Sequence, residues 1–162
     1  MKTAIYPGTF DPITYGHIDV IKKSLNIFDR VIVATTDNVN KNYHFSIEDR
    51  IEIINNSLFK DLKLNKYKIK VISFDNLTID LCKKYKAGTI IRGLRAVSDF
   101  EYEFQLAGMN KKLNTKIETM FLMSDIENQI ISSKFVKEIA SLGGKINRFV
   151  TKSTVKVLKK KI

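Results

Sequence analysis

Short apolar runs alternate with amphipathic helical patterns along the whole chain. Five runs are typical of buried β-strands because they are short, apolar and bounded by turn residues: Thr3–Tyr6, Arg30–Thr36, Lys70–Phe74, Thr89–Ile91 and Ile117–Leu122. Between and after them, apolar residues recur at helical spacing in six segments, around 18–28, after Ser46, and over Leu77–Lys86, Val97–Leu113, Ser133–Leu142 and Thr154–Ile162. Strands that alternate with helices predict an α/β fold, a doubly wound parallel sheet of five strands with helices on both faces.

Length and composition favour one globular domain. The 162 residues show no internal repeat and no linker, so we expect a single domain over 1–162, with 151–162 as a basic helix or tail. No run of 18 apolar residues occurs, which predicts no membrane span. The single cysteine, Cys82, excludes a disulfide framework and is expected to be a small buried residue. The first residues lack a signal-peptide core, and we expect a cytoplasmic location.

The charge is strongly positive. Lysine and arginine number 28 and aspartate and glutamate 17, which gives a formal charge of +11. This excess favours an anionic partner, either nucleic acid or phosphorylated small molecules. A general enrichment in lysine explains it equally well, because the lysines are scattered along the chain. A basic stripe with interleaved aromatic residues is missing, so we expect no nucleic-acid partner.

The unusual polar residues follow the predicted strands, where open α/β sheets bind ligands. They are the loop 8–17, Lys41, the segment Arg92–Arg95 and the pair Ser132-Ser133. In the first loop, Gly8 permits a close turn, and Gly16 leaves the start of the next helix open to a phosphate. His17 lies in the first turn of that helix, where an imidazole can donate to a phosphate oxygen and its protonated form can stabilise transition-state charge.

Several common sites are excluded. The chain has no Gly-x-x-x-x-Gly-Lys-Ser/Thr loop, no Gly-x-Gly-x-x-Gly and no Gly-x-Ser-x-Gly elbow. No paired Cys and His spacing suggests zinc. The second histidine, His44, is expected to be a solvated surface residue.

Three motifs together resemble one family. The run Gly8-Thr9-Phe10-Asp11-Pro12 with Thr14-Tyr15-Gly16-His17 is similar to the Thr/His-x-Gly-His signature of the Rossmann-like nucleotidylyltransferases. Arg92-Gly93-Leu94-Arg95 with the run 99–103, and Ile131-Ser132-Ser133 with the run 136–138, resemble the bacterial phosphopantetheine adenylyltransferases. The resemblance covers essentially the whole chain.

The resemblance implies a reaction and roles for residues. ATP and 4′-phosphopantetheine would give dephospho-coenzyme A and pyrophosphate by direct attack, without a covalent intermediate. The implied catalytic residues are Thr9, His17, Lys41 and Arg92; the implied substrate contacts are Thr9, Lys41, Thr78 and Arg92. The implied ATP contacts are Thr9, Phe10, His17, Gly93, Leu94, Arg95, Glu103, Asn128, Gln129, Ile130, Ile131, Ser132, Ser133 and Lys134. Mg²⁺ would accompany ATP, held by phosphates and water and by no direct protein ligand. A homohexamer and feedback binding of coenzyme A are implied as well.

The sequence leaves alternative roles open at some positions. Arg92 either binds a substrate phosphate or forms a structural ion pair with Asp99 or Glu103. Ser132 and Ser133 cap a helix, bind phosphate, or do both. Phe100, Phe104 and Met109 belong to the core or to a subunit interface.

The chain departs from the family pattern in one loop. Asn128-Gln129-Ile130 replaces an aromatic-Ser-Phe run, and Lys134 replaces the third serine of the turn. Lys134 either adds a contact to the γ-phosphate or faces water. The alternatives to the leading function are a relative with a different phosphate acceptor, such as nicotinate mononucleotide, a basic nucleic-acid-binding protein, and a scaffold that has lost activity; the intact Thr9, His17, Lys41 and Arg92 argue against the last.

Overall fold

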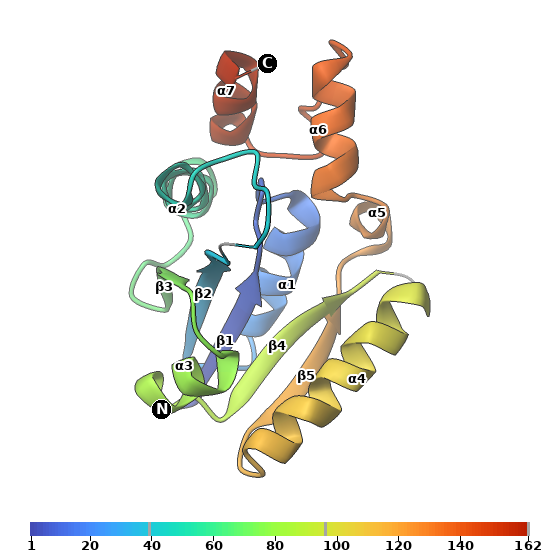
Figure 1. Ribbon diagram of the computed structural model, residues 1–162. Coiled ribbons are helices and arrows are strands. Elements are labelled where there is room, and N and C mark those ends of the chain that lie inside the picture. Colours follow the sequence, from blue (N-terminus) through green and yellow to red (C-terminus); the bar gives the residue numbers. More distant parts are fainter. Residues whose placement is uncertain (39, 96, 162) are drawn as a thin grey trace.

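The computed structural model describes residues 1–38, 40–95 and 97–161, without the side chains of Val97 and Ser98. Its centre is one sheet of five parallel strands in the order β3-β2-β1-β4-β5 (Figure 1). The strands are β1 (Thr3–Gly8), β2 (Arg30–Thr36), β3 (Ile69–Phe74), β4 (Thr89–Leu94) and β5 (Glu118–Met123). The chain runs outward from β1 to β3 and then returns to add β4 and β5 on the other side. The carboxyl ends of β1 and β4 therefore flank the point where the strand order reverses.

Seven α-helices and one π-helical turn surround this sheet in the described residues. They are α1 (Tyr15–Leu25), α2 (Ile47–Asn55), η1 (Asn56–Asp61), α3 (Thr78–Tyr85), α4 (Val97–Leu113), α5 (Ile126–Gln129), α6 (Ser133–Ser141) and α7 (Lys152–Lys161). The predicted doubly wound α/β fold is confirmed. The hydrophobic pattern missed α5, which is too short to show a period. The helical pattern that begins after Ser46 continues to Leu58, so it includes part of η1 but does not predict the π-helical geometry.

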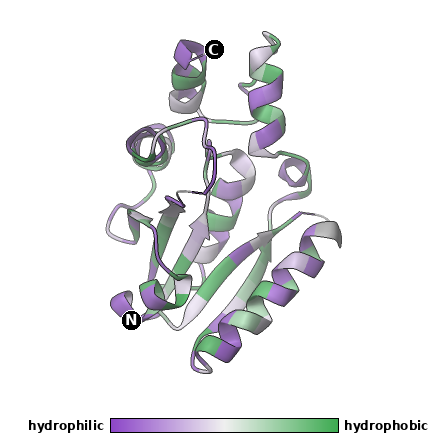
Figure 2. Ribbon diagram, in the orientation of Figure 1, coloured by the Kyte–Doolittle hydropathy of each residue, from purple (hydrophilic) through white to green (hydrophobic). Residues whose placement is uncertain are grey.

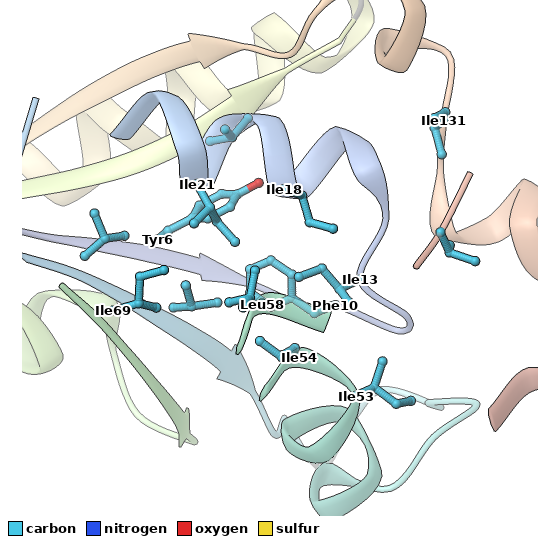
Figure 3. Packing of buried hydrophobic residues seen from close by; sticks show 14 of the residues in the cluster. Tyr6, Phe10, Ile13, Ile18, Ile21, Ile53, Ile54, Leu58, Ile69 and Ile131 are labelled. Carbon is cyan, nitrogen blue, oxygen red and sulfur yellow. The ribbon is translucent and has the colours of Figure 1, made fainter. Parts of the chain in front are cut away.

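The strands bury alternate residues against different helices. Ala4 and Tyr6 of β1 belong to the larger apolar cluster, which α1 and α2 cover, whereas Ile5 belongs to the cluster beneath α3. Figure 3 shows Phe10 and Ile13, from the loop after β1, among the apolar residues of α1 and α2. The loop that carries the predicted chemistry is thus anchored in the core by its own side chains.

The predicted strand ends need correction. Pro7-Gly8 does not end β1, because Pro7 pairs with Ala34 and Gly8 with Thr35 in the parallel ladder. Leu77, the first residue of the predicted helical segment Leu77–Lys86, is 58% exposed because it precedes the first turn of α3 as its N-cap. Ser46, after which the predicted helical pattern begins, is the N-cap of α2, and its Oγ accepts from the backbone N–H of Asp49 at 3.1 Å.

Helix α4 leaves apolar side chains uncovered. Phe100, Phe104 and Met109 are between 46% and 64% exposed, so they are not core residues of a single chain. In Figure 2, hydrophobic and hydrophilic residues alternate along α4. The helix lies along β4 and β5, as Figure 1 shows.

Helices α6 and α7 lie beside one another at the end of the molecule towards which the strands point (Figure 1). Helix α7 is held by Val155 and Leu158, which enter the larger apolar cluster. The predicted helical tail is therefore packed on the domain. Within the described part of the chain, no helix has the length and apolar character needed to cross a membrane.

Candidate active site

A cavity of about 810 Å³ opens at the carboxyl ends of the strands. It is lined by residues from the loops after β1, β2, β3, β4 and β5 and from the start of α6. Most of the residues proposed from the sequence meet here: Thr9, Phe10, His17, Lys41, Thr78, Arg92, Gly93, Leu94, Arg95, Glu103, Ile131, Ser132, Ser133 and Lys134. Segments far apart in the sequence thus share one concave surface, as the parallel topology requires.

The two glycines of the first loop permit close packing. A Cβ atom on Gly8 would lie 2.8 Å from the ring of Phe10, because that ring folds back over the loop. Phe10 itself adopts a left-handed conformation, with φ of 46°. A Cβ atom on Gly16 would lie 3.1 Å from the carbonyl oxygen of Asn128, so the open space expected there is used by the segment after β5.

His17 is oriented by the residue that caps its helix. The backbone N–H of Thr14 donates to Nδ1 of His17 at 3.1 Å, and the Thr14 hydroxyl lies 3.0 Å from the same atom. Since a backbone N–H can only donate, Nδ1 is the acceptor and the neutral ring carries its proton on Nε2. The ring edge also packs against Phe10, with centroids 5.1 Å apart.

Burial and nearby cations keep His17 neutral. Burial, followed by the charges of Arg95 and Arg92, lowers the pKa of His17 from 6.5 to about 4. In the ligand-free protein at neutral pH the imidazole is therefore neutral. The neutral ring still offers Nε2–H as a donor.

The structure shows one of the two roles considered for Arg92, the ion pair with Glu103. Its Nε and Nη2 donate to the two carboxylate oxygens of Glu103 at 2.7 and 2.5 Å, and its Nη1 donates to the carbonyl of Pro7 at 3.0 Å. Burial opposes the charge of Arg92, but the bonds and charge of Glu103 raise the pKa of the guanidinium. Arg92 therefore forms the structural ion pair and also lines the cavity.

Asp11 joins three parts of the cavity wall. Its carboxylate accepts from the amides of His44 and Phe45 at 2.8 and 2.9 Å and from Nζ of Lys137 at 2.9 Å. These donors outweigh burial and lower the pKa of Asp11. Neither Asp11 nor Lys137 has a role that the sequence pattern predicts, although Asp11 lies in the loop 8–17. The side chain of His44 is exposed, in agreement with its expected surface position.

Both serines of the turn before α6 are engaged. Ser132 caps the helix by accepting from the amide of Phe135 at 3.1 Å, and the Ser133 hydroxyl donates to the carbonyl of Pro12 at 2.7 Å. The capping role is thus present. Lys134 lines the cavity and is exposed.

Three proposed ATP contacts lie elsewhere. The side-chain amide of Asn128 donates from Nδ2 to the carboxylate of Asp19 at 2.6 Å, and the side-chain amide of Gln129 donates from Nε2 to the backbone carbonyl of Ser124 at 3.1 Å. Ile130 is 79% exposed and lines a separate apolar pocket of about 210 Å³ beside α6. These three side chains therefore do not line the main cavity, unlike Ile131.

The cavity favours an anionic ligand. Five cationic side chains and three carboxylates line it, and each carboxylate is paired with one of the cations. The cations are Lys41, Arg92, Arg95, Lys134 and Lys137. Among the described residues, no group of three or more His, Cys, Asp and Glu side chains is arranged to hold a metal ion. Such a surface can hold phosphates through arginine, lysine and hydroxyl groups.

Comparison with known proteins agrees with this chemistry. Residues 5–139 match the family model described as "Cytidylyltransferase-like". The chain is 68% identical over 160 residues to the phosphopantetheine adenylyltransferase of Pelagibacter ubique, covering 99% of this chain and 98% of that protein. It is 51% identical over 160 residues to that of Legionella pneumophila (strain Lens), covering 99% and 91%.

Solved structures share the fold at low sequence identity. The Plasmodium falciparum nicotinic acid mononucleotide adenylyltransferase, complexed with NaAD, superposes with a TM-score of 0.71 at 19% identity, covering 99% of this chain and 96% of that one. The Francisella tularensis bifunctional NMN adenylyltransferase/ADP ribose pyrophosphatase gives 0.74 at 14% identity, covering 98% and 49%. With the cavity, the motifs and the full-length identities in agreement, the chain belongs to the phosphopantetheine adenylyltransferase family.

Proposed function

We propose that this chain transfers the adenylyl group of ATP to 4′-phosphopantetheine and releases dephospho-coenzyme A and pyrophosphate. The observation that carries the proposal is that His17, Lys41 and Arg92 line one cavity at the switch point of the sheet. The relatives named phosphopantetheine adenylyltransferase support the choice of substrates.

The strand order suggests how the substrates divide the cavity. Lys41 and Thr78 follow β2 and β3, whereas Gly93–Arg95 lie at the end of β4 and Ser132–Lys134 follow β5. We place the phosphopantetheine arm on the first side and the nucleotide on the second. The reacting phosphates then lie between them, beside Thr9, His17 and Arg92.

The reaction needs no protein nucleophile. An oxygen of the phosphopantetheine phosphate forms a bond to the α-phosphorus of ATP in line with the bond to the β-phosphate oxygen, which breaks as pyrophosphate leaves. The protein positions the two phosphates and donates hydrogen bonds to the charge that develops between them. His17 donates a hydrogen bond from Nε2, and Lys41 supplies a positively charged ammonium group. The substrate phosphate accepts hydrogen bonds from the Arg92 guanidinium in competition with the carboxylate of Glu103.

Mg²⁺ enters this proposal as part of the Mg-ATP substrate. The carboxylates of the cavity already accept from Lys or Arg side chains, as with Glu103 on Arg92. We therefore propose that phosphate oxygens and water complete the coordination of the ion.

Turnover with defined acceptors tests the function. The protein is incubated with Mg-ATP and 4′-phosphopantetheine, and dephospho-coenzyme A is sought by mass. Nicotinate mononucleotide replaces phosphopantetheine in a parallel reaction. Dephospho-coenzyme A from the first reaction alone supports the proposal. A dinucleotide from the second alone would assign the chain to a different acceptor.

The proposal extends to assembly, feedback and location. The exposed Phe100, Phe104 and Met109 on α4 suit a subunit interface, so we propose that this helix contributes to a homohexamer. Light scattering that finds only single chains would refute the hexamer.

Coenzyme A is proposed to bind the same cavity as a feedback inhibitor, and the reaction is placed in the cytoplasm, where the single thiol, Cys82, stays buried and free.

A further inference from the structure

Arg50 of α2 is fully buried although it carries a charge. Its Nη1 donates to the carbonyls of Thr9 and Thr36 at 3.1 and 2.7 Å and to the hydroxyl of Thr35 at 3.2 Å. Its Nη2 donates to the carboxylate of Asp37 at 3.2 Å. The Thr35 hydroxyl donates to the same Thr9 carbonyl at 3.0 Å. One guanidinium thus ties the first residue after β1 to the last residues of β2.

A second set of contacts leads from Arg50 to Lys41. The guanidinium carbon lies 3.9 Å from the centre of the Tyr43 ring, a cation–π contact. The Tyr43 hydroxyl accepts from the amide of Asn38 at 3.0 Å, and the carbonyl of Asn38 accepts from the amide of Lys41 at 3.0 Å. The backbone that carries Lys41 is therefore held through Tyr43 and Asp37, both in contact with Arg50.

This arrangement is an unfavourable way to gain stability. Its one anionic partner, Asp37, is half-exposed, and among the described residues Nε of Arg50 finds no hydrogen-bond partner. Removing an ion from water costs several kcal/mol, and an apolar side chain of similar volume often serves the fold equally well. The benefit of the charge must then come from what its donors fix in place.

We propose that Arg50 is a positioning residue that sets Thr9 and Lys41 at the correct separation for the phosphate of phosphopantetheine. Arg50 is not among the residues that line the cavity, whereas Thr9, Thr36, Lys41 and Tyr43 are. Arg50 therefore acts through them. Its hydrogen-bond and cation–π partners lie at the end of β2 and on the loops after β1 and β2, so the nucleotide side beyond β4 keeps its geometry when Arg50 is changed. This inference rests on the proposed function.

The test compares the two substrates in Arg50→Lys, which keeps the charge and loses the planar fork. We expect kcat/KM for phosphopantetheine to fall at least tenfold, while the Kd of Mg-ATP, measured by calorimetry without the acceptor, changes less than threefold. Equal losses for both substrates, or a change below twofold for phosphopantetheine, would overturn the proposal. Wild-type protein that forms no dephospho-coenzyme A would instead refute the proposed function.

A second pair of variants covers the case in which Arg50→Lys does not fold. Thr35→Val keeps the shape of a buried β-branched residue but removes the hydroxyl shared by Arg50 and the Thr9 carbonyl. Thr35→Ser keeps that hydroxyl and is the matched control. We expect Thr35→Val to raise KM for phosphopantetheine at least threefold relative to Thr35→Ser, with the Kd of Mg-ATP equal in both. Identical values of KM would contradict the positioning role.

Discussion

Replacing His17 separates its two hydrogen bonds, one structural and one proposed to be catalytic. Nδ1 accepts from the Thr14 amide at 3.1 Å, which leaves Nε2–H as the donor for the substrates. His17→Ala removes both groups. His17→Asn offers an amide oxygen near the position of Nδ1 and removes the donor at Nε2. The two variants therefore differ in the helix cap and share the catalytic defect.

The structure sets the size of each effect. Loss of one donor to a developing phosphate charge costs about 2.7 kcal/mol or more, which is at least a hundredfold in kcat. In His17→Ala the buried amide of Thr14 also loses its acceptor, at a cost of about 1–3 kcal/mol in stability. His17→Asn should recover most of that stability and none of the turnover.

Three measurements check this reasoning. Pyrophosphate release gives kcat, calorimetry gives the Kd of Mg-ATP, and thermal unfolding gives stability. We expect both variants to bind Mg-ATP and to lose kcat alike, with only His17→Ala unfolding earlier. A kcat of His17→Asn within tenfold of wild type would remove His17 from the reaction. Equal unfolding temperatures for the two variants would contradict the capping role of Nδ1.

Four further outcomes follow from the same structure. Because the pKa of His17 is lowered from 6.5 to about 4, its contribution to stability is complete above pH 6.5 and is lost as the pH falls towards 4. The free energy of unfolding of the wild-type protein should therefore decrease between pH 6.5 and 4 by more than that of His17→Asn. Arg92→Lys keeps the charge without the fork and should raise KM for phosphopantetheine at least tenfold in steady-state kinetics; an unchanged KM would return Arg92 to a purely structural role. Lys134→Ser should change KM for ATP less than tenfold, or about 1.4 kcal/mol, and a hundredfold change would make Lys134 a main phosphate ligand. Leu158→Ala removes a fully buried side chain of α7 and should lower stability by about 2–5 kcal/mol in chemical denaturation, whereas an exposed helix would lose almost nothing.

The sequence predicted the sheet because its strands are buried on both faces. Continuous apolar runs such as Arg30–Thr36 are typical of strands between two layers of helices, and this strand has the predicted bounds. The same logic located the cavity, since His17 lies in the loop 8–17 after one such run and Arg92 directly follows another. The parallel topology places both residues at the same edge of the sheet, so this prediction needs no information about side-chain contacts.

The details that escaped prediction depend on contacts between distant segments. Nothing local shows that Asp11 accepts from Lys137, 126 residues further along the chain, or that Arg50 reaches the Thr9 carbonyl. The neutral state of His17 arises from burial and from the charges of Arg95, just after β4, and Arg92, near the end of β4, which spacing alone does not reveal. The loop at Asn128 departs from the family pattern, and its side chain is held by Asp19 on α1.

A crystal structure with bound dephospho-coenzyme A tests most directly whether His17, Lys41 and Arg92 contact the same phosphate groups. We predict that the phosphate groups joining the two halves of the product lie within hydrogen-bond distance of His17 Nε2, Lys41 Nζ and the Arg92 guanidinium, with the base on the side of β4 and β5. Phosphates that contact none of these three side chains, or a base placed beside Thr78, would contradict the account.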